Sequence, residues 1–116
     1  MRRSLLLAAV VLGVPALGAA AMSATAATSV SVTAGKPSEL HFKLSSSSVS
    51  KGAVTFKVKN SGTLAHDFKI AGKTTKLLKK GKSTTLTVTL KKGKYTYLCT
   101  VPGHAAGGMK GKLTVR

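Results

Sequence analysis

The chain has 116 residues, and its nineteen Lys and Arg against two acidic residues give it a formal net charge of +17. A single cysteine excludes an intrachain disulfide and an iron–sulfur cluster, which needs at least two cysteines. The strong basic charge suggests nucleic-acid binding, but the lysines are spread over many segments with no arginine cluster and few aromatic residues to stack on bases.

The first 27 residues are expected to be a signal peptide for export, not part of the folded domain. Arg2 and Arg3 provide the positive start, residues 5–17 are apolar, and small residues at 19–21 or 24–26 offer cleavage sites. The second site is better placed because strand-like alternation begins just after it. Export also argues against nucleic acid as a partner.

An uncleaved membrane anchor is the alternative for this segment. A spanning helix needs about twenty apolar residues, and Pro15 and Gly18 interrupt the apolar stretch. We therefore expect a periplasmic or otherwise extracytoplasmic protein. Residues 28–116 then form one small domain of about ninety residues, for which a bound metal would add stability.

Short alternating segments separated by Gly, Ser and Lys turns run through residues 28–116 and predict an all-β domain. The segments are residues 30–32, 40–44, 54–58, 66–70, 86–90, 95–99 and 113–115. Seven or eight strands at this spacing predict a Greek-key β-sandwich without helices. Tyr95 is either a tyrosine corner, with its hydroxyl bonded to nearby backbone, or a plain core residue.

Four side chains have the chemistry of one metal site: His66, Cys99, His104 and Met109. One thiolate and two imidazoles form a trigonal plane, and a thioether adds a weak axial ligand; this is the ligand set of a mononuclear blue-copper centre. Alternation along residues 66–70 places His66 on the inner face, where an unpaired imidazole would be costly. His41, the third histidine, is expected to lie outside the site.

Each of these residues alone has an ordinary structural explanation. Cys99 could be a buried thiol, His66 a hydrogen-bonded histidine and Met109 a core residue. The joint pattern favours the metal, because Pro102 and Gly103 let the chain turn back toward His104. Structural zinc is a poor match, and a cysteine nucleophile would need a histidine that is better used as a ligand.

The stretch from Cys99 to Met109 is similar to the cupredoxin family, with the pattern Cys-x-x-Pro-Gly-His-Ala-Ala-x-Gly-Met. It most resembles rusticyanin-like and sulfocyanin-like members; azurins have a shorter His-to-Met gap and plastocyanins a shorter Cys-to-His gap. The resemblance implies a plastocyanin-like copper-binding domain with one type 1 copper ion. It also implies an outer hydrogen bond, here from Thr100 to Asp67, where many cupredoxins have an asparagine. The alternative is an exposed Asp67 paired with a lysine.

We therefore expect an exported, monomeric electron-transport protein that is not an enzyme and that exchanges single electrons with redox partner proteins. The alternative is a copper carrier or storage protein, but such proteins are commonly rich in Met and His. Electrons are expected to pass at the edge of His104, inside an uncharged rim formed by Val101, Pro102, Gly103, Ala105, Ala106 and Gly107. The lysines could steer an acidic partner or an anionic membrane surface toward the protein, or they could only keep it soluble.

Overall fold

Alternation of apolar and polar residues produces nine strands in the computed structural model, which describes residues 28–116. They are β1 (Thr28–Ala34), β2 (Phe42–Leu44), β3 (Ser48–Val49), β4 (Gly52–Asn60), β5 (Lys69–Ile70), β6 (Lys73–Thr74), β7 (Ser83–Leu90), β8 (Gly93–Leu98) and β9 (Lys110–Val115). Three of the nine have only two residues each. The described residues contain no helix, as predicted.

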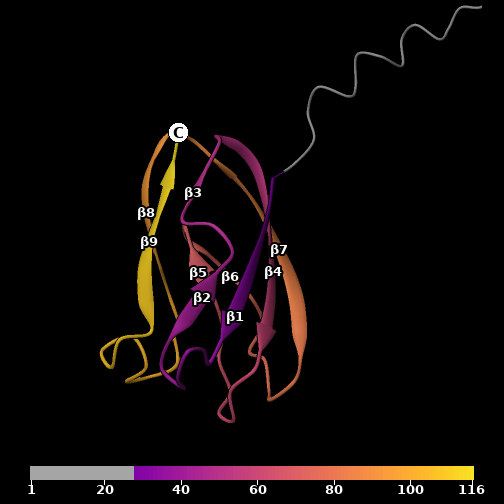
Figure 1. Ribbon diagram of the computed structural model, residues 1–116, viewed down its shortest axis with the longest axis vertical. Coiled ribbons are helices and arrows are strands. Elements are labelled where there is room, and N and C mark those ends of the chain that lie inside the picture. The colour runs from indigo at the N-terminus through magenta and orange to yellow at the C-terminus, as the bar shows by residue number, and fades with distance from the viewer. Residues whose placement is uncertain (1–27) are drawn as a thin grey trace, which may run out of the picture.

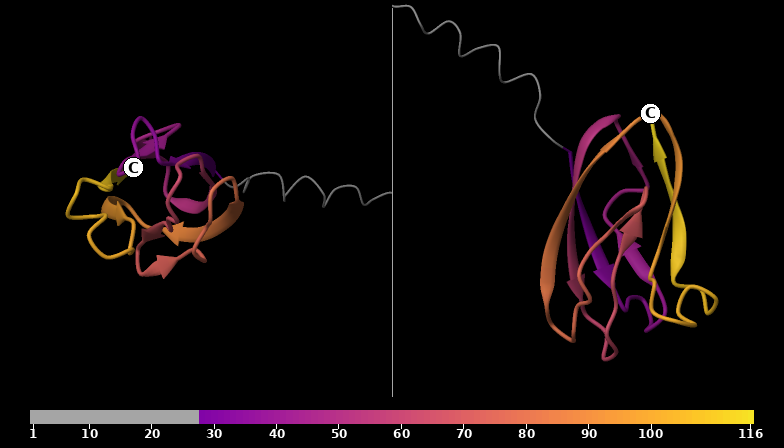
Figure 2. Two further views of the ribbon diagram at one scale, coloured as in Figure 1. Left: turned by 90° about the horizontal axis from the view of Figure 1, so that it is seen from below. Right: turned by 180° about the vertical axis from the view of Figure 1, so that it is seen from behind.

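The strands form two sheets that face each other, as Figure 1 and both views of Figure 2 show. One sheet has the order β2-β1-β4-β7 and the other the order β3-β9-β8-β5-β6. The pairs β1–β4 and β3–β9 are parallel, whereas the other paired strands are antiparallel. The all-β sandwich predicted from the alternation is confirmed.

Strand β4 shows how the alternation builds the core. Val54, Phe56 and Val58 are at most 1% exposed, whereas Lys57 and Lys59 on the opposite face are exposed. Each buried side chain of this kind stabilises the fold by about 1.5–3 kcal/mol. Buried residues of β1, β3, β5, β7 and β9, together with Phe68 and Leu78, belong to the same cluster between the sheets.

Tyr95 ties the connection between β7 and β8 to the second sheet. Its hydroxyl donates a hydrogen bond to the Lys91 carbonyl oxygen at 2.8 Å. This is the geometry of a tyrosine corner. Tyr95 also packs against the main core cluster, so it serves both of the roles considered from the sequence.

The two ends of the sandwich carry different parts of the chain. The start of β1 and the C-terminus lie at one end, whereas the loop between β8 and β9 lies at the other (Figure 1). No helix within residues 28–116 has the length and apolar character to span a membrane. The predicted signal peptide, residues 1–27, lies outside the described residues.

Candidate metal centre

His66 lies on a segment that is less regular than the strand predicted for residues 66–70. Only Lys69–Ile70 is a strand, and His66 instead forms an isolated bridge with Leu78 through two backbone hydrogen bonds of 2.8 and 3.0 Å. The sheet ladder is interrupted because side chains satisfy backbone groups here: the Phe68 N–H donates to Oγ1 of Thr75 at 3.1 Å. The predicted inward face is confirmed, since His66, Phe68 and Ile70 are fully buried.

Cys99 directly follows β8, and the chain then forms a closed loop that returns to β9. The Cys99 N–H donates to the Met109 carbonyl oxygen at 3.1 Å, and the Met109 N–H donates to the His104 carbonyl oxygen at 3.0 Å. Gly103 has a φ of 85°, which suits the turn that brings His104 back toward Cys99. The loop backbone therefore fixes all three residues relative to one another.

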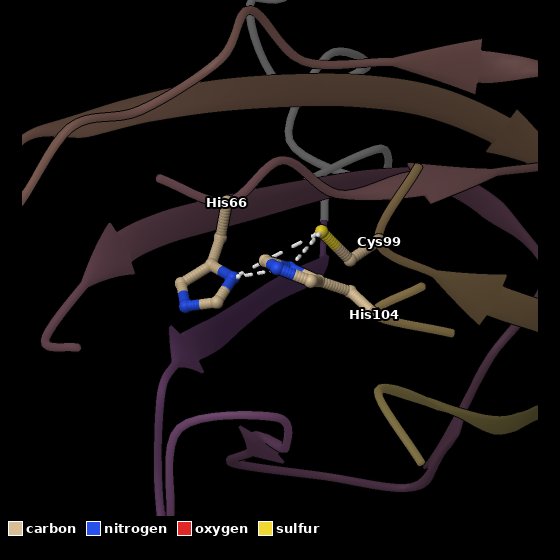
Figure 3. Close-up of side chains that lie close together, drawn as sticks. All are labelled: His66, Cys99 and His104. Atoms are coloured by element: carbon tan, nitrogen blue, oxygen red, sulfur yellow. Dashed lines mark hydrogen bonds between the residues drawn. The ribbon is translucent and has the colours of Figure 1, made fainter. Parts of the chain in front are cut away.

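Three donor atoms converge at this end of the sandwich (Figure 3). Nδ1 of His66 lies 3.2 Å from Nδ1 of His104, and Sγ of Cys99 lies 3.9 and 3.6 Å from these two nitrogens. One ion could bond all three atoms at metal–nitrogen and metal–sulfur lengths of about 2.0–2.3 Å. The arrangement fits a metal ion, because an ion can accept a lone pair from each of the three donor atoms at once.

Met109 completes the predicted set. It is fully buried and forms a small core cluster with Ala34 and Cys99, against which Leu40 and Val101 pack. A soft thioether beside a thiolate and two imidazoles is the donor set of a blue-copper site. All four predicted residues are therefore together at one end of the fold.

The outer hydrogen bond predicted at Asp67 is confirmed. Oδ1 of Asp67 accepts the Thr100 backbone N–H at 2.6 Å, and Oδ2 accepts the Thr100 hydroxyl. Asp67 is 7% exposed, so the alternative of a solvent-facing aspartate paired with a lysine is excluded. The bond joins the residue after His66 to the residue after Cys99.

Glu39 is a residue of the site that the sequence reasoning missed. Its Oε2 lies 2.6 Å from Nε2 of His66, and its carboxylate also accepts hydrogen bonds from Thr63 and Leu64. One signal was available: Glu39 and Asp67 are the only acidic residues of the chain. An acidic residue in so basic a chain is a candidate for a specific role.

The surroundings shift two pKa values in the site. Burial raises the pKa of the Cys99 thiol above its ordinary value of 9.0, so a bound cation would have to stabilise the thiolate. The pKa of Glu39 is lowered from 4.5 to about 2, first by the Thr63 backbone N–H and then by His66 and Leu64. Glu39 is therefore ionised at neutral pH.

His41 lies outside the centre, as predicted. It is exposed just before β2, and its Nδ1 is 2.6 Å from the Ser38 hydroxyl. The part of the chain that the structure describes thus has one group of His, Cys and acidic residues with metal-binding geometry, formed by His66, Cys99 and His104.

A β-sandwich that holds two histidines, a cysteine and a methionine in this way defines the class of single-ion type 1 copper proteins. Residues 27–116 match the model of the copper-binding proteins of the plastocyanin/azurin family. The chain therefore belongs to this family, the cupredoxins, and its cofactor is one type 1 copper ion. No relative was found among curated proteins.

Solved structures show the same fold. The chain is 26% identical to auracyanin B, with a TM-score of 0.67 over 79% of this chain and 90% of auracyanin B. It is 24% identical to auracyanin A, a "blue" copper protein from Chloroflexus aurantiacus, with a TM-score of 0.66 over 78% of this chain and all of auracyanin A. For rusticyanin from Thiobacillus ferrooxidans the identity is 24% and the TM-score 0.66, over 78% and 77% of the two chains.

Proposed function

We propose that this protein is an exported electron carrier that passes single electrons between redox partners and catalyses no reaction of its own. Copper in such a site supplies the one-electron couple between Cu(I) and Cu(II). The observation that carries the proposal is the convergence of three donor atoms, all within 4.8 Å of one another. Backbone hydrogen bonds hold the segments that carry these atoms. A site fixed in this way requires little rearrangement when an electron moves.

The protein residues have separate tasks in this function. His66, Cys99, His104 and Met109 would hold the ion. The Cys99–Met109 and Met109–His104 backbone bonds keep the loop closed. Burial of Cys99 and Met109 at 1% or less keeps water from the sulfur atoms.

The edge of His104 is the proposed electron entry and exit. His104 is partly exposed, whereas His66 is fully buried. Within residues 28–116 the side-chain hydrogen-bond contacts of His104 are made by Nδ1 and not by Nε2. Exposed uncharged residues surround it, among them Pro102, Gly103 and Ala106. A partner could cover this rim without removing a charge from water.

The strong positive charge of the chain supports an acidic redox partner. The one ion pair within residues 28–116 joins Glu39 to His66, so the lysines of this region have no carboxylate partner in the structure. Their unneutralised field would attract an acidic protein or an anionic membrane surface. The protein is proposed to act as a monomer, and nucleic acid is not proposed as a partner.

Copper carriage or storage is the alternative function. Cargo sites exchange their metal, which requires accessible ligands. Here three of the four proposed ligands are at most 1% exposed, and this burial favours a resident ion over a cargo ion.

The test starts from purified protein loaded with Cu(II). An electron carrier should be intensely blue, should bleach with a mild reductant and should recover its colour on reoxidation. Its copper should also exchange slowly with a chelator in both oxidation states. Colourless copper binding, or rapid transfer of copper to the chelator, would support the cargo function and contradict the proposal.

A further inference from the structure

Nε2 of the buried His66 ring contacts a carboxylate outside the predicted ligand motif. Nε2 of His66 lies 2.6 Å from Oε2 of Glu39, and Glu39 is 27 positions earlier in the chain. An ionised carboxylate can only accept hydrogen bonds, so Nε2 carries the proton. In the neutral ring, Nδ1 is then unprotonated and faces Cys99 and His104.

We propose that Glu39 is a positioning residue of the metal centre: it holds His66 in the tautomer that presents Nδ1 to the ion, and its fixed negative charge favours the oxidised ion. This inference rests on the proposed copper function and adds a residue to it. A carboxylate bonded to the second nitrogen of a ligand histidine fixes the ring orientation and strengthens the donor. The chain therefore selects the ligating atom before any metal is bound.

Glu39 itself is held firmly. Thr63 donates its backbone N–H at 2.9 Å and its hydroxyl at 2.9 Å to Oε1, and the Leu64 N–H donates at 3.1 Å to Oε2. These bonds join the segment between β1 and β2 to the segment between β4 and β5. A carboxylate with this many donors has little freedom to leave His66 for a lysine.

The backbone around Glu39 is built to admit its side chain. A Cβ atom at Gly62 would overlap the Glu39 carboxylate, so only glycine fits at this position without movement. The fully buried Asn60 fixes the same segment: its Oδ1 accepts the Gly62 N–H at 2.8 Å, and its Nδ2 donates to the carbonyl oxygens of Leu64 and Leu78, both at 2.8 Å. Leu78 is the bridge partner of His66. One network thus positions both Glu39 and the ring that it contacts.

Composition gives independent support. The chain has two acidic residues among 116, and the structure places both beside the proposed ligands. Glu39 contacts His66 directly, whereas Asp67 accepts hydrogen bonds from the backbone N–H and the hydroxyl of Thr100, the residue after Cys99. Neither forms an ion pair with a lysine within residues 28–116. The negative charge of this basic protein is therefore concentrated at its metal centre.

The central experiment compares wild type with Glu39→Gln, which keeps the size of the side chain and one of its two acceptor oxygens and removes the charge. Thr74→Lys is the control, because it also makes the net charge one unit more positive, at an exposed position on β6. In the copper-loaded proteins, Glu39→Gln should favour Cu(I) over Cu(II) by about tenfold, which is about 59 mV for one electron. Thr74→Lys should leave the midpoint potential within error of wild type. Equal potentials for Glu39→Gln and wild type would overturn the charge role.

The tautomer is tested without metal, by nitrogen NMR of the histidine rings in the apoprotein. Wild type should show His66 protonated at Nε2, whereas Glu39→Ala should show a mixture of tautomers and faster exchange of the ring proton. Glu39→Ala should also bind copper about 10–100-fold more weakly. Protonation of wild-type His66 at Nδ1, or the same ring spectrum for wild type and Glu39→Ala, would overturn the positioning role.

The two proposals fail in different ways. Wild-type protein that binds copper without a blue colour would contradict the electron-carrier function, whatever the variants do. A blue wild type with a reversible couple, together with an unshifted potential in Glu39→Gln, would contradict only the role of the Glu39 charge.

Discussion

The Asp67 carboxylate accepts two hydrogen bonds from Thr100, one from the backbone N–H at 2.6 Å and one from the hydroxyl. Asp67 follows His66 and Thr100 follows Cys99, so this contact joins the two segments that carry the histidine and the thiol. It fixes their separation and adds a negative charge close to the sulfur. The hydrogen bonds are confirmed, whereas their effect on the copper couple is a prediction.

Replacement of Asp67 by asparagine should raise the midpoint potential. The asparagine oxygen can still accept the Thr100 N–H, but the negative charge that favours Cu(II) is lost. We expect a shift of about tenfold in the preference for Cu(I), or about 59 mV, measured by redox titration. Thr100→Val is the control: it keeps the N–H bond and the charge, and its shift should be smaller. An unchanged midpoint potential in Asp67→Asn would show that the Asp67 charge does not affect the copper couple.

Cys99→Ala should abolish the blue absorption of the copper-loaded protein. The band arises from the bond between thiolate and copper, and Cys99 is the only cysteine of the chain. Visible absorption spectra after addition of Cu(II) provide the measurement, and far-ultraviolet circular dichroism shows that the variant is folded. A folded Cys99→Ala protein that is still blue would refute the ligand assignment.

Met109→Leu should keep the blue colour and shift the midpoint potential, because the axial ligand tunes the couple and does not create the thiolate band. The swap nearly conserves side-chain volume, so its cost in unfolding free energy should be below about 1.5 kcal/mol even though Met109 is fully buried. Absorption, redox titration and denaturant unfolding are the three measurements. Complete loss of copper would show that Met109 is more than a weak axial partner.

Gly62→Ala should destabilise the protein by about 1–3 kcal/mol, the usual cost of losing hydrogen bonds to a charged group. The new methyl group would overlap the Glu39 carboxylate, which must then move away from His66. Unfolding of the apoprotein by urea measures the loss. Ser61→Ala, at the exposed neighbouring position, is the control and should stay within about 0.5 kcal/mol of wild type. Equal stability of Gly62→Ala and wild type would show that the loop adapts freely.

Electron transfer to an acidic redox protein should slow steeply as salt rises. The lysines within residues 28–116 have no carboxylate partner in the structure, and exposed charges are screened beyond about 8 Å at physiological ionic strength. We expect the bimolecular rate constant to fall by about tenfold or more between low and high salt, measured by stopped-flow spectroscopy. An uncharged electron donor is the control. A flat salt dependence would mean that the lysines only keep the protein soluble.

Much of this protein could be predicted from local sequence. Alternation with a period of two identified most of the longer strands and the buried face of His66, because strand side chains point to opposite sides in turn. Cys99, His104 and Met109 lie on one short loop, so their spacing alone indicates that they meet. The bond from Tyr95 to Lys91 also spans only four residues.

Other features depend on contacts between distant segments. The parallel pairing of β1 with β4 and the bridge between His66 and Leu78 follow from how the sheets assemble, and no local pattern records them. The segment after His66 is less regular than alternation suggests. The Phe68 N–H donates to the Thr75 hydroxyl instead of to a neighbouring strand, and the Asp67 carboxylate accepts from Thr100 instead of facing solvent.

The sequence by itself determined the chemistry of the centre: one thiol, two imidazoles and a thioether, with spacing that suits a single copper ion. Only the tertiary structure decided which nitrogen of His66 faces Cys99 and His104, because Glu39, 27 residues away in the chain, reaches the other nitrogen through the packing of two loops. Ligand identity is a property of residue type, whereas tautomer and outer charge depend on which distant groups the fold places within hydrogen-bond distance.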